Sequence, residues 1–350
     1  MLADEVDAVI GGDTHRDSHA LEMAAPNGGT IGTLAIGNDE TGYADAIAWI
    51  TQNSPGPRVI VGLEGTRSYG VGLTRALQAA GFLVLEVEQP RRADRRRGKS
   101  DPIDAHLAAL QVLRMPADRK ALPRSDGDRE ALRILLIARR EMTTVKTQQI
   151  NRLRALLLTG DDADRELCRG PMSDAHLQLI ARRRGRLDDT KEQQIRRGEA
   201  RRLALAIRQA TSELAANKKQ LAELVASFAA GLLDKFGVGP VSAAQAIVSF
   251  SHPGRCRNEA AFAALAGVSP LQASSGRTVR HRLNRGGDRQ LNRALHDIVK
   301  TRWRDCPRTH AYIAARRAEG KSDPEIRRCL KRYVARELFR ALTAARVDNT

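Results

Sequence analysis

Aromatic residues are scarce in this sequence, at 3% of its 350 positions. Proteins that bind single strands by base stacking need aromatic platforms, so that binding mode is not expected. The four cysteines, at positions 168, 256, 306 and 329, are widely spaced and form no Cys-x-x-Cys pair. This pattern argues against a disulfide framework and favours idle thiols in a reduced, cytosolic setting.

Long apolar runs are also missing. Nothing approaches the ~18 uninterrupted apolar residues of a spanning helix, and the N-terminus lacks a basic-then-apolar signal pattern. Positive charge, in contrast, is abundant: 58 Lys and Arg residues stand against 41 Asp and Glu, a formal net charge of +17. We therefore expect a polyanionic partner, and nucleic acid is favoured over a membrane.

The first ~115 residues have the pattern of a mixed α/β domain. Strand-like runs at 6–12, 19–24 and 32–36 are joined by short turns, so they are expected to pair antiparallel. Helices at 41–51 and 69–80 then alternate with strands at 58–63 and 82–87. This order is typical of the ribonuclease-H-like fold, in which acids from the first strand, the fourth strand and a late helix converge.

Four acids occupy those places. Asp13 closes the first strand-like run, Glu64 closes the fourth, and Asp101 and Asp104 share one face of an expected helix. Strand ends are where α/β sheets place chemistry. Carboxylates gathered there repel each other unless a divalent cation neutralises them, and Mg²⁺ suits such oxygen ligands. In a strongly basic protein, the set predicts phosphodiester chemistry.

Individually, these acids have ordinary structural explanations. Asp13 could cap a turn, and Asp17 is a competing acid four residues later. Asp101 could be a first-turn helix residue, with Ser100 as the cap and Pro102 after it. The four acids together, at the expected places in one topology, favour the catalytic interpretation.

Glu64 follows a buried-looking strand, where a charge is costly without a counter-ion. His15, His19 and His106 lie near the acids in the sequence and could be metal ligands. They are interpreted instead as exposed polar residues or DNA contacts, because no His/Cys ligand spacing is present.

Two basic runs are candidate nucleic-acid contacts. One directly precedes the Asp101/Asp104 pair, and the other follows a Ser-Ser-Gly motif near the C-terminus. Basic runs are commonly solvated loops, but these places favour contacts with backbone phosphates. Their members are Arg91, Arg92, Arg95, Arg96, Arg97 and Lys99 in the first run, and Arg277, Arg280, Arg282, Arg285 and Arg289 in the second.

The middle of the chain is expected to be helical. Apolar residues between 203 and 228 follow a 4-3-4-3 spacing for nearly four heptads, with the polar Asn217 in the seam. A weaker seam covers 135–156. The two seams could pair as an intramolecular antiparallel hairpin, or one could pair with a second subunit.

The last third contains two candidate elements. Gly237 to Pro240, followed by an apolar helix, resembles a helix–hairpin–helix module, whose glycines let backbone N–H groups approach phosphate. The motif Ser274-Ser275-Gly276 is either a turn in a basic loop or the site of a nucleophilic serine with arginines nearby. His281 and Asp288 lie close in sequence, but no fixed Ser–His–Asp spacing is visible.

Taken together, these motifs resemble the DEDD transposases of bacterial insertion sequences, the insertion-sequence one-hundred-ten family of bridge-RNA-guided recombinases. The resemblance is carried by Asp13 in Gly-Gly-Asp-Thr-His-Arg-Asp, Glu64 in Gly-Leu-Glu-Gly, the Lys-Ser-Asp-x-x-Asp-Ala run at 99–105, and Ser-Ser-Gly at 274–276. It covers nearly the whole chain in the right order. It implies a RuvC-like catalytic domain at 1–120, a helical coiled-coil spacer at 121–230, and a C-terminal transposase domain at 231–350.

The resemblance also implies a mechanism and partners. The four acids would hold Mg²⁺, and Ser275 would form a covalent serine–phosphate linkage, with the adjacent Ser274 as an alternative. A non-coding bridge RNA would pair with double-stranded donor and target DNA, and the active unit would be a homo-oligomer, a tetramer built from dimers. The alternatives are a RuvC-like structure-selective hydrolytic endonuclease that leaves Ser275 idle, and a nucleic-acid-binding protein without catalysis.

Overall fold

The computed structural model describes residues 1–89, 100–118, 120–124, 126–185, 188–252, 254–272, 281–282 and 284–347. The chain forms two compact units. One combines Met1–Glu130 with Phe250–Ala264, and the other combines Ala131–Ser249 with Leu265–Thr350. The three-part division inferred from the family resemblance stays a prediction.

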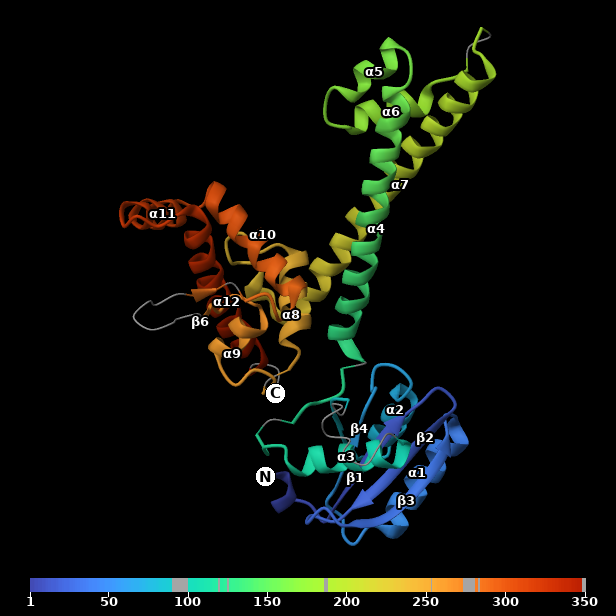
Figure 1. The fold of residues 1–350 in the computed structure, drawn as a ribbon, viewed down its shortest axis with the longest axis vertical. Helices are drawn as coiled ribbons and strands as arrows, with labels where there is room; N and C mark the ends of the chain where they lie inside the picture. Colours follow the sequence, from blue (N-terminus) through green and yellow to red (C-terminus); the bar gives the residue numbers. More distant parts are fainter. Residues whose placement is uncertain are drawn as a thin grey trace. The chain divides into compact units, whose positions relative to one another are not determined.

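The first unit is built on a five-stranded sheet in the order β3-β2-β1-β4-β5 (Figure 1). The first three strands are antiparallel, whereas β4 and β5 run parallel to β1. This mixed, ribonuclease-H-like sheet confirms the predicted order of strands and helices. The elements are η1 (Leu2–Asp4), β1 (Ala8–Thr14), β2 (Ser18–Ala24), β3 (Thr30–Gly37), α1 (Glu40–Asn53), β4 (Val59–Leu63), α2 (Val71–Ala79), β5 (Leu83–Glu86) and α3 (Asp101–Leu113).

Helices cover both faces of this sheet. Side chains alternate along a strand, so Ile10 of β1 packs with α1 and α2, while its neighbour Val9 packs with α3. Both faces are therefore buried. This explains why β1 and β4 consist almost entirely of apolar and small residues.

Glycines let α3 lie unusually close to the sheet. A Cβ atom built on Gly11 would overlap the backbone of Ala105 and Ala109, and one built on Gly62 would overlap the side chain of Val112. The absence of these side chains brings the helix onto β1 and β4. The start of α3 is thereby held beside the end of β1.

Two long helices dominate the second unit, and they contact each other through a buried polar residue. Asn217 is 4% exposed. Its Nδ2 donates to the Leu135 carbonyl at 3.0 Å, and its Oδ1 accepts from Arg139 at 3.3 Å. The intramolecular pairing is thus present. The long helices are α4 (Gly127–Leu158) and α7 (Lys191–Ala229), and α5 (Asp162–Cys168) and α6 (Asp174–Arg182) lie between them in the chain.

The buried positions of these helices match the expected seams unequally. On α7, Leu203, Ile207 and Leu221 are buried, as the heptad spacing predicts. On α4 the weaker predicted seam is wrong, because Val145 is exposed while Leu153 and Leu157 fill the core shared with α6 and α7. Because polar residues interrupt the apolar spacing of α4, the sequence specifies poorly which face of this helix is buried.

The remaining elements of the chain are two short strands and further helices. A two-stranded antiparallel ribbon of β6 (Leu271–Gln272) and β7 (His281–Arg282) was not predicted. No described helix is long and apolar enough to cross a bilayer. The other elements are η2 (Ala230–Leu232), α8 (Pro240–Phe250), α9 (Glu259–Leu265), α10 (Arg289–Asp305), α11 (Pro307–Ala318) and α12 (Asp323–Val347).

The Gly237–Pro240 turn packs against α10. Gly237 has φ +77°, a conformation that favours glycine. Arg302 of α10 donates from Nε to the Phe236 carbonyl at 2.8 Å. The turn leads directly into α8, while its assignment as a helix–hairpin–helix module stays a prediction.

Candidate active site

Asp13 lies inside β1 rather than after it. The strand continues two residues beyond the predicted end because Asp13 pairs with Ala20 and Thr14 pairs with His19 on β2. The Asp13 side chain is on the same side of the strand as Gly11, which α3 approaches. Asp13 is 5% exposed. The fold therefore buries this carboxylate beneath the start of α3.

The start of α3 supplies two more acids. Asp101 is the first residue of the helix and Pro102 the second, while Ser100 at the N-cap makes no side-chain capping bond. Asp101 is 56% exposed on its side chain, whereas Asp104, three residues later, is buried. One helical turn thus presents one carboxylate to solvent and one toward the sheet.

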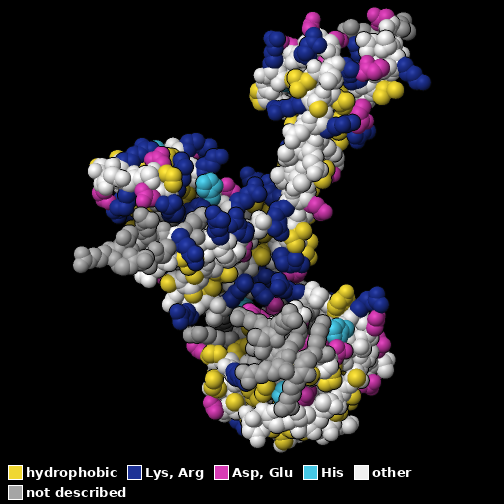
Figure 2. Space-filling model, in the orientation of Figure 1, with side chains coloured by type: hydrophobic (Ala, Val, Ile, Leu, Met, Phe, Trp, Pro, Cys, Tyr) yellow, Lys and Arg dark blue, Asp and Glu magenta, His cyan; other side chains and the backbone are white. Residues whose placement is uncertain are grey.

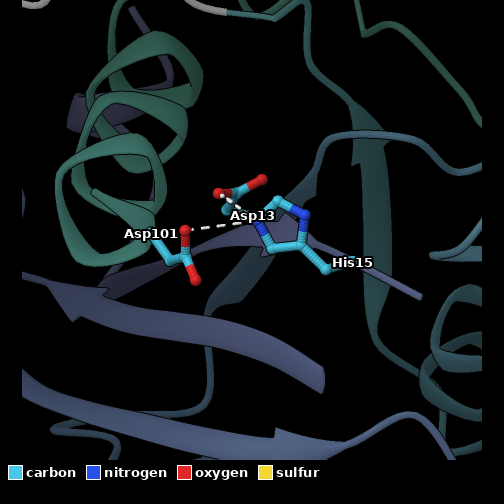
Figure 3. Close-up of side chains that lie close together, drawn as sticks. All are labelled: Asp13, His15 and Asp101. Carbon is cyan, nitrogen blue, oxygen red and sulfur yellow. Dashed lines mark hydrogen bonds and ion pairs between the residues drawn. The ribbon is translucent and has the colours of Figure 1, made fainter. Parts of the chain in front are cut away.

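Asp13, His15 and Asp101 converge at this corner (Figure 3). The Nε2 atom of His15 lies 3.2 Å from Asp13 Oδ2 and 3.3 Å from Asp101 Oδ1. One ligand atom of each of the three side chains falls within 4.8 Å of the others. The packing of α3 on the sheet brings Asp101, at the start of this helix, next to Asp13 and His15 at the end of β1.

Electrostatics at Asp13 reflect this crowding. Burial raises the pKa of Asp13 above its usual value, and the charges of Asp104 and Asp101 raise the pKa further. His15 acts in the opposite direction. The site therefore contains a carboxylate whose negative charge is unfavourable until a cation approaches.

Glu64 lies beside this corner, but its carboxylate is not in the group of three. Its backbone N–H donates to Gly12 on β1 at 3.0 Å, and its carbonyl accepts from the Thr14 hydroxyl at 2.8 Å. The predicted strand-end position of Glu64 is therefore observed. Of the four predicted acids, the structure brings Asp13, Asp101 and Asp104 near one another, and Glu64 directly follows the adjacent strand β4.

The histidines differ from their sequence interpretation. His15 is half-exposed, as expected, yet it contacts both carboxylates. For His19 the expected exposure is wrong: it is 1% exposed, stacks on Tyr43 and donates from Nε2 to Asn38 Oδ1 at 3.0 Å. His106 is partly buried, with Nδ1 2.6 Å from Glu22 Oε1. The feature of the sequence that could have identified His15 as a site residue is its position two residues after Asp13.

These donors suit a metal ion. The carboxylates and an imidazole nitrogen are ligand types that divalent cations accept, and a cation would offset the repulsion among the acids. The cluster is therefore compatible with a bound metal, and its donors do not identify which one. A group of mostly oxygen donors is consistent with Mg²⁺.

The predicted nucleic-acid contacts are divided between described and other residues. The whole first basic run, both serines of the Ser-Ser-Gly motif, Arg277 and Arg280 lie outside the described residues. Arg282 lies on β7, Arg289 opens α10, and Arg285 lies between them; all three are exposed. The chain between β6 and β7 includes both serines.

Asp288 has a structural role at the start of α10. Its Oδ1 accepts from the backbone N–H groups of Gln290 at 2.9 Å and Leu291 at 3.0 Å. Its Oδ2 accepts from the Ser249 hydroxyl at 2.6 Å. Asp288 is thus a fully engaged N-cap, which argues against its service as the acid of a serine triad.

Comparison with protein families gives two matches in chain order. A DEDD transposase model of the IS110 group, described as a transposase, matches residues 10–160. A second model, described as a transposase of the IS116/IS110/IS902 family, matches residues 230–314. The first span includes all four acids, and the second includes the Ser-Ser-Gly motif. A search of curated proteins gave no match.

Proposed function

This chain belongs to the IS110 family of DEDD transposases, and from that premise we propose that it recombines DNA under the guidance of a non-coding bridge RNA. As a transposase, it acts on DNA by phosphoryl transfer. The finer proposal adds a serine–phosphate intermediate and a guide RNA that pairs with donor and target DNA. The observation that carries the metal-assisted phosphoryl transfer is the meeting of Asp13 and Asp101 at the end of β1.

In this proposal Asp13, Glu64, Asp101 and Asp104 hold the metal and orient the scissile phosphate. Bound Mg²⁺ would polarise a phosphoryl oxygen and neutralise the charge that develops on it. Support comes from the burial of Asp13 and Asp104, which fixes their carboxylates, and from the exposure of Asp101, which leaves one acid accessible to a substrate. The close approach of α3 at Gly11 holds these groups in place.

Ser275 is the proposed nucleophile. A bond forms between its Oγ and the phosphorus as the bond from phosphorus to one strand oxygen breaks. The serine loses its proton, and the departing strand oxygen gains one. Attack by a hydroxyl of the exchanged strand then reforms a phosphodiester and releases the serine, so that no water is consumed. Neighbouring arginines, including Arg282, would stabilise the phosphoryl oxygens.

The partners follow the same proposal. The two basic runs would grip the backbones of DNA and RNA, and the long α4 and α7 helices would act as a coiled-coil spacer. A tetramer of this chain would bring composite sites together. The high net charge supports nucleic-acid partners in general.

A hydrolytic RuvC-like endonuclease is the alternative. The same acids would activate water, and Ser275 would have no role. The acid cluster suits both mechanisms equally. They differ in the cleaved DNA end, which is attached to serine in recombination and free after hydrolysis.

A trapping assay tests the proposal. Purified protein, RNA transcribed from the flanking element ends, Mg²⁺ and end-labelled donor and target DNA are mixed, denatured and examined for DNA that migrates with the protein. We expect an adduct that is lost in Ser275→Ala and kept in Ser274→Ala. If the adduct is lost in Ser274→Ala and kept in Ser275→Ala, the nucleophile is Ser274 instead.

The matched controls separate the parts of the proposal. Asp101→Asn should abolish cleavage and adduct together, a loss of at least about a hundredfold if the acid stabilises the transition state. Omission of the RNA should abolish the reaction if guidance is required. Free cleaved ends without an adduct, unaffected by Ser275→Ala, would instead establish the hydrolytic nuclease.

A further inference from the structure

A cavity of about 270 Å³ opens within the second unit. Its walls come from α4, from the first two turns of α8 and from α10. Few apolar side chains line it, and no aromatic one does. The residues on which the argument depends are Arg139, Arg140, Ser242, Gln245, Arg293 and Asp297.

The cavity carries excess positive charge. Three guanidinium groups face one carboxylate, Asp297. None of the three arginines forms an ion pair with an acid in the described part of the chain, whereas other arginines of the same unit, such as Arg183, Arg208 and Arg302, do so. Lys and Arg side chains also gather over α10 on the face shown in Figure 2. An anion in this cavity would therefore find cations that no acid has already neutralised.

Arg139 is held in a fixed position. Its Nη1 donates to the Leu214 carbonyl at 2.8 Å and to Asn217 Oδ1 at 3.3 Å, so both long helices define its place. Burial lowers the pKa of its guanidinium, which reflects a charge removed from water without an acidic partner. The remaining donors of this group stay available to a ligand, since arginine has five N–H donors.

The other polar side chains fit a sugar–phosphate backbone. The amide of Gln245 uses one bond to Ser249 at 3.0 Å and keeps a second N–H, and Ser242 lies in the first turn of α8. Guanidinium, hydroxyl and amide groups, together with helix N-termini, are the donors that proteins present to phosphate and sugar. Without an aromatic wall, the cavity offers no stacking surface for a base.

We propose that this cavity, lined by Arg139, Arg140 and Arg293, binds a backbone phosphate of a nucleic-acid strand. The inference rests on the proposed function only in taking nucleic acid as the substrate. It requires neither RNA guidance nor the serine intermediate. The cavity would contact the backbone of one strand, and so contribute affinity without sequence preference.

Salt-dependent binding tests the inference. Full-length Arg140→Gln/Arg293→Gln is compared with wild type by fluorescence anisotropy on labelled single-stranded RNA, single-stranded DNA and duplex DNA, in EDTA. Both arginines are exposed, so the fold should persist. Each lost contact should flatten the plot of log K against log salt by about 0.9 for duplex or about 0.7 for a single strand. At about 0.1 M salt this corresponds to roughly tenfold weaker binding per contact.

Two further variants sharpen the result. Arg201→Gln/Lys218→Gln removes two exposed cations of α7 outside the cavity and should leave the slope unchanged. Asp297→Asn removes the one acid of the cavity and should strengthen binding of the same strand that the arginine variant weakens. This gain cannot arise from misfolding.

The three nucleic acids identify which kind of strand the cavity binds, because Arg140→Gln/Arg293→Gln should lower the affinity for that kind alone. Unchanged slopes for all three nucleic acids, or a loss no larger than in the α7 control, would overturn the inference. EDTA removes divalent metal, so neither cleavage nor adduct formation takes place in this assay. Ser275→Ala should therefore bind the nucleic acids as tightly as wild type does. A failure of the recombinase mechanism is therefore distinct from a failure of this site.

Discussion

Asp13 is a carboxylate that the fold removes from water and places near two other acids. Its pKa is raised by burial and by Asp104 and Asp101, so the folded protein binds its proton more tightly than the unfolded chain does. Stability therefore falls as pH rises from the unfolded pKa through the raised folded value, and the penalty is complete above it. A divalent cation at the site would offset this penalty.

We therefore expect Asp13→Asn to raise the melting temperature of the metal-free protein at neutral pH, because it removes the unfavourable charge. The gain should shrink as pH is lowered through the raised pKa of Asp13, because protonation removes the wild-type charge. Thermal melts in EDTA between about pH 4 and 8 measure both effects. Adding Mg²⁺ should then stabilise wild type but not the variant, and equal stabilisation of the two would exclude Asp13 as a ligand.

At the scale of elements, the position of α3 depends on residues that lack side chains. Gly11→Ala would drive a Cβ atom into the backbone of Ala105 and Ala109. We expect a loss of about 1–3 kcal/mol in unfolding free energy from overpacking. Activity should fall about a hundredfold through displacement of Asp101 and Asp104.

The matched control for this change is Gly198→Ala in the exposed interior of α7, where a Cβ meets nothing within 4 Å. It should stabilise the protein by about 1 kcal/mol through helix propensity. Chemical denaturation and strand cleavage measure both variants. A Gly11→Ala protein with wild-type cleavage would show that α3 need not lie so close.

The contact between α4 and α7 offers a second test at this scale. Asn217→Leu should cost about 1–3 kcal/mol, because it removes an acceptor from the partly buried Arg139. Arg139→Met together with Asn217→Leu should recover much of that loss, since both polar partners are replaced. A double-mutant cycle by urea denaturation measures the coupling, and additive effects would mean that the polar contact does not fix the pairing.

For the whole molecule, the dominant quantity is the net charge of +17. Binding driven by backbone contacts is strongly salt-dependent because it releases counterions. With six to ten phosphate contacts, affinity for duplex DNA should fall by about 10³–10⁵ between roughly 50 and 200 mM salt. Anisotropy titrations across that range test the expectation, and a nearly flat response would mean that contacts with bases carry the affinity.

The order of strands and helices in the first unit was predictable from sequence because alternation and turn residues act locally. The strand-end places of Asp13 and Glu64 and the helix start at Asp101 were predictable for the same reason. The seam of α4 was predicted in the wrong register, since interrupted apolar spacing defines a face poorly. The burial of His19 was missed because its partners, Asn38 and Tyr43, come from a later loop and helix.

The family, the mixed α/β fold and the acidic and basic motifs follow from residue type and spacing along the chain, so they could be predicted before the structure was known. Which side chains contact one another depends on the packing of the elements. The contact of His15 with Asp101, the hydrogen bond from Ser249 to Asp288 and the arginine-lined cavity each join distant segments. Such contacts depend on how closely elements pack, as at Gly11 beneath α3, and periodicity along a chain does not encode that distance.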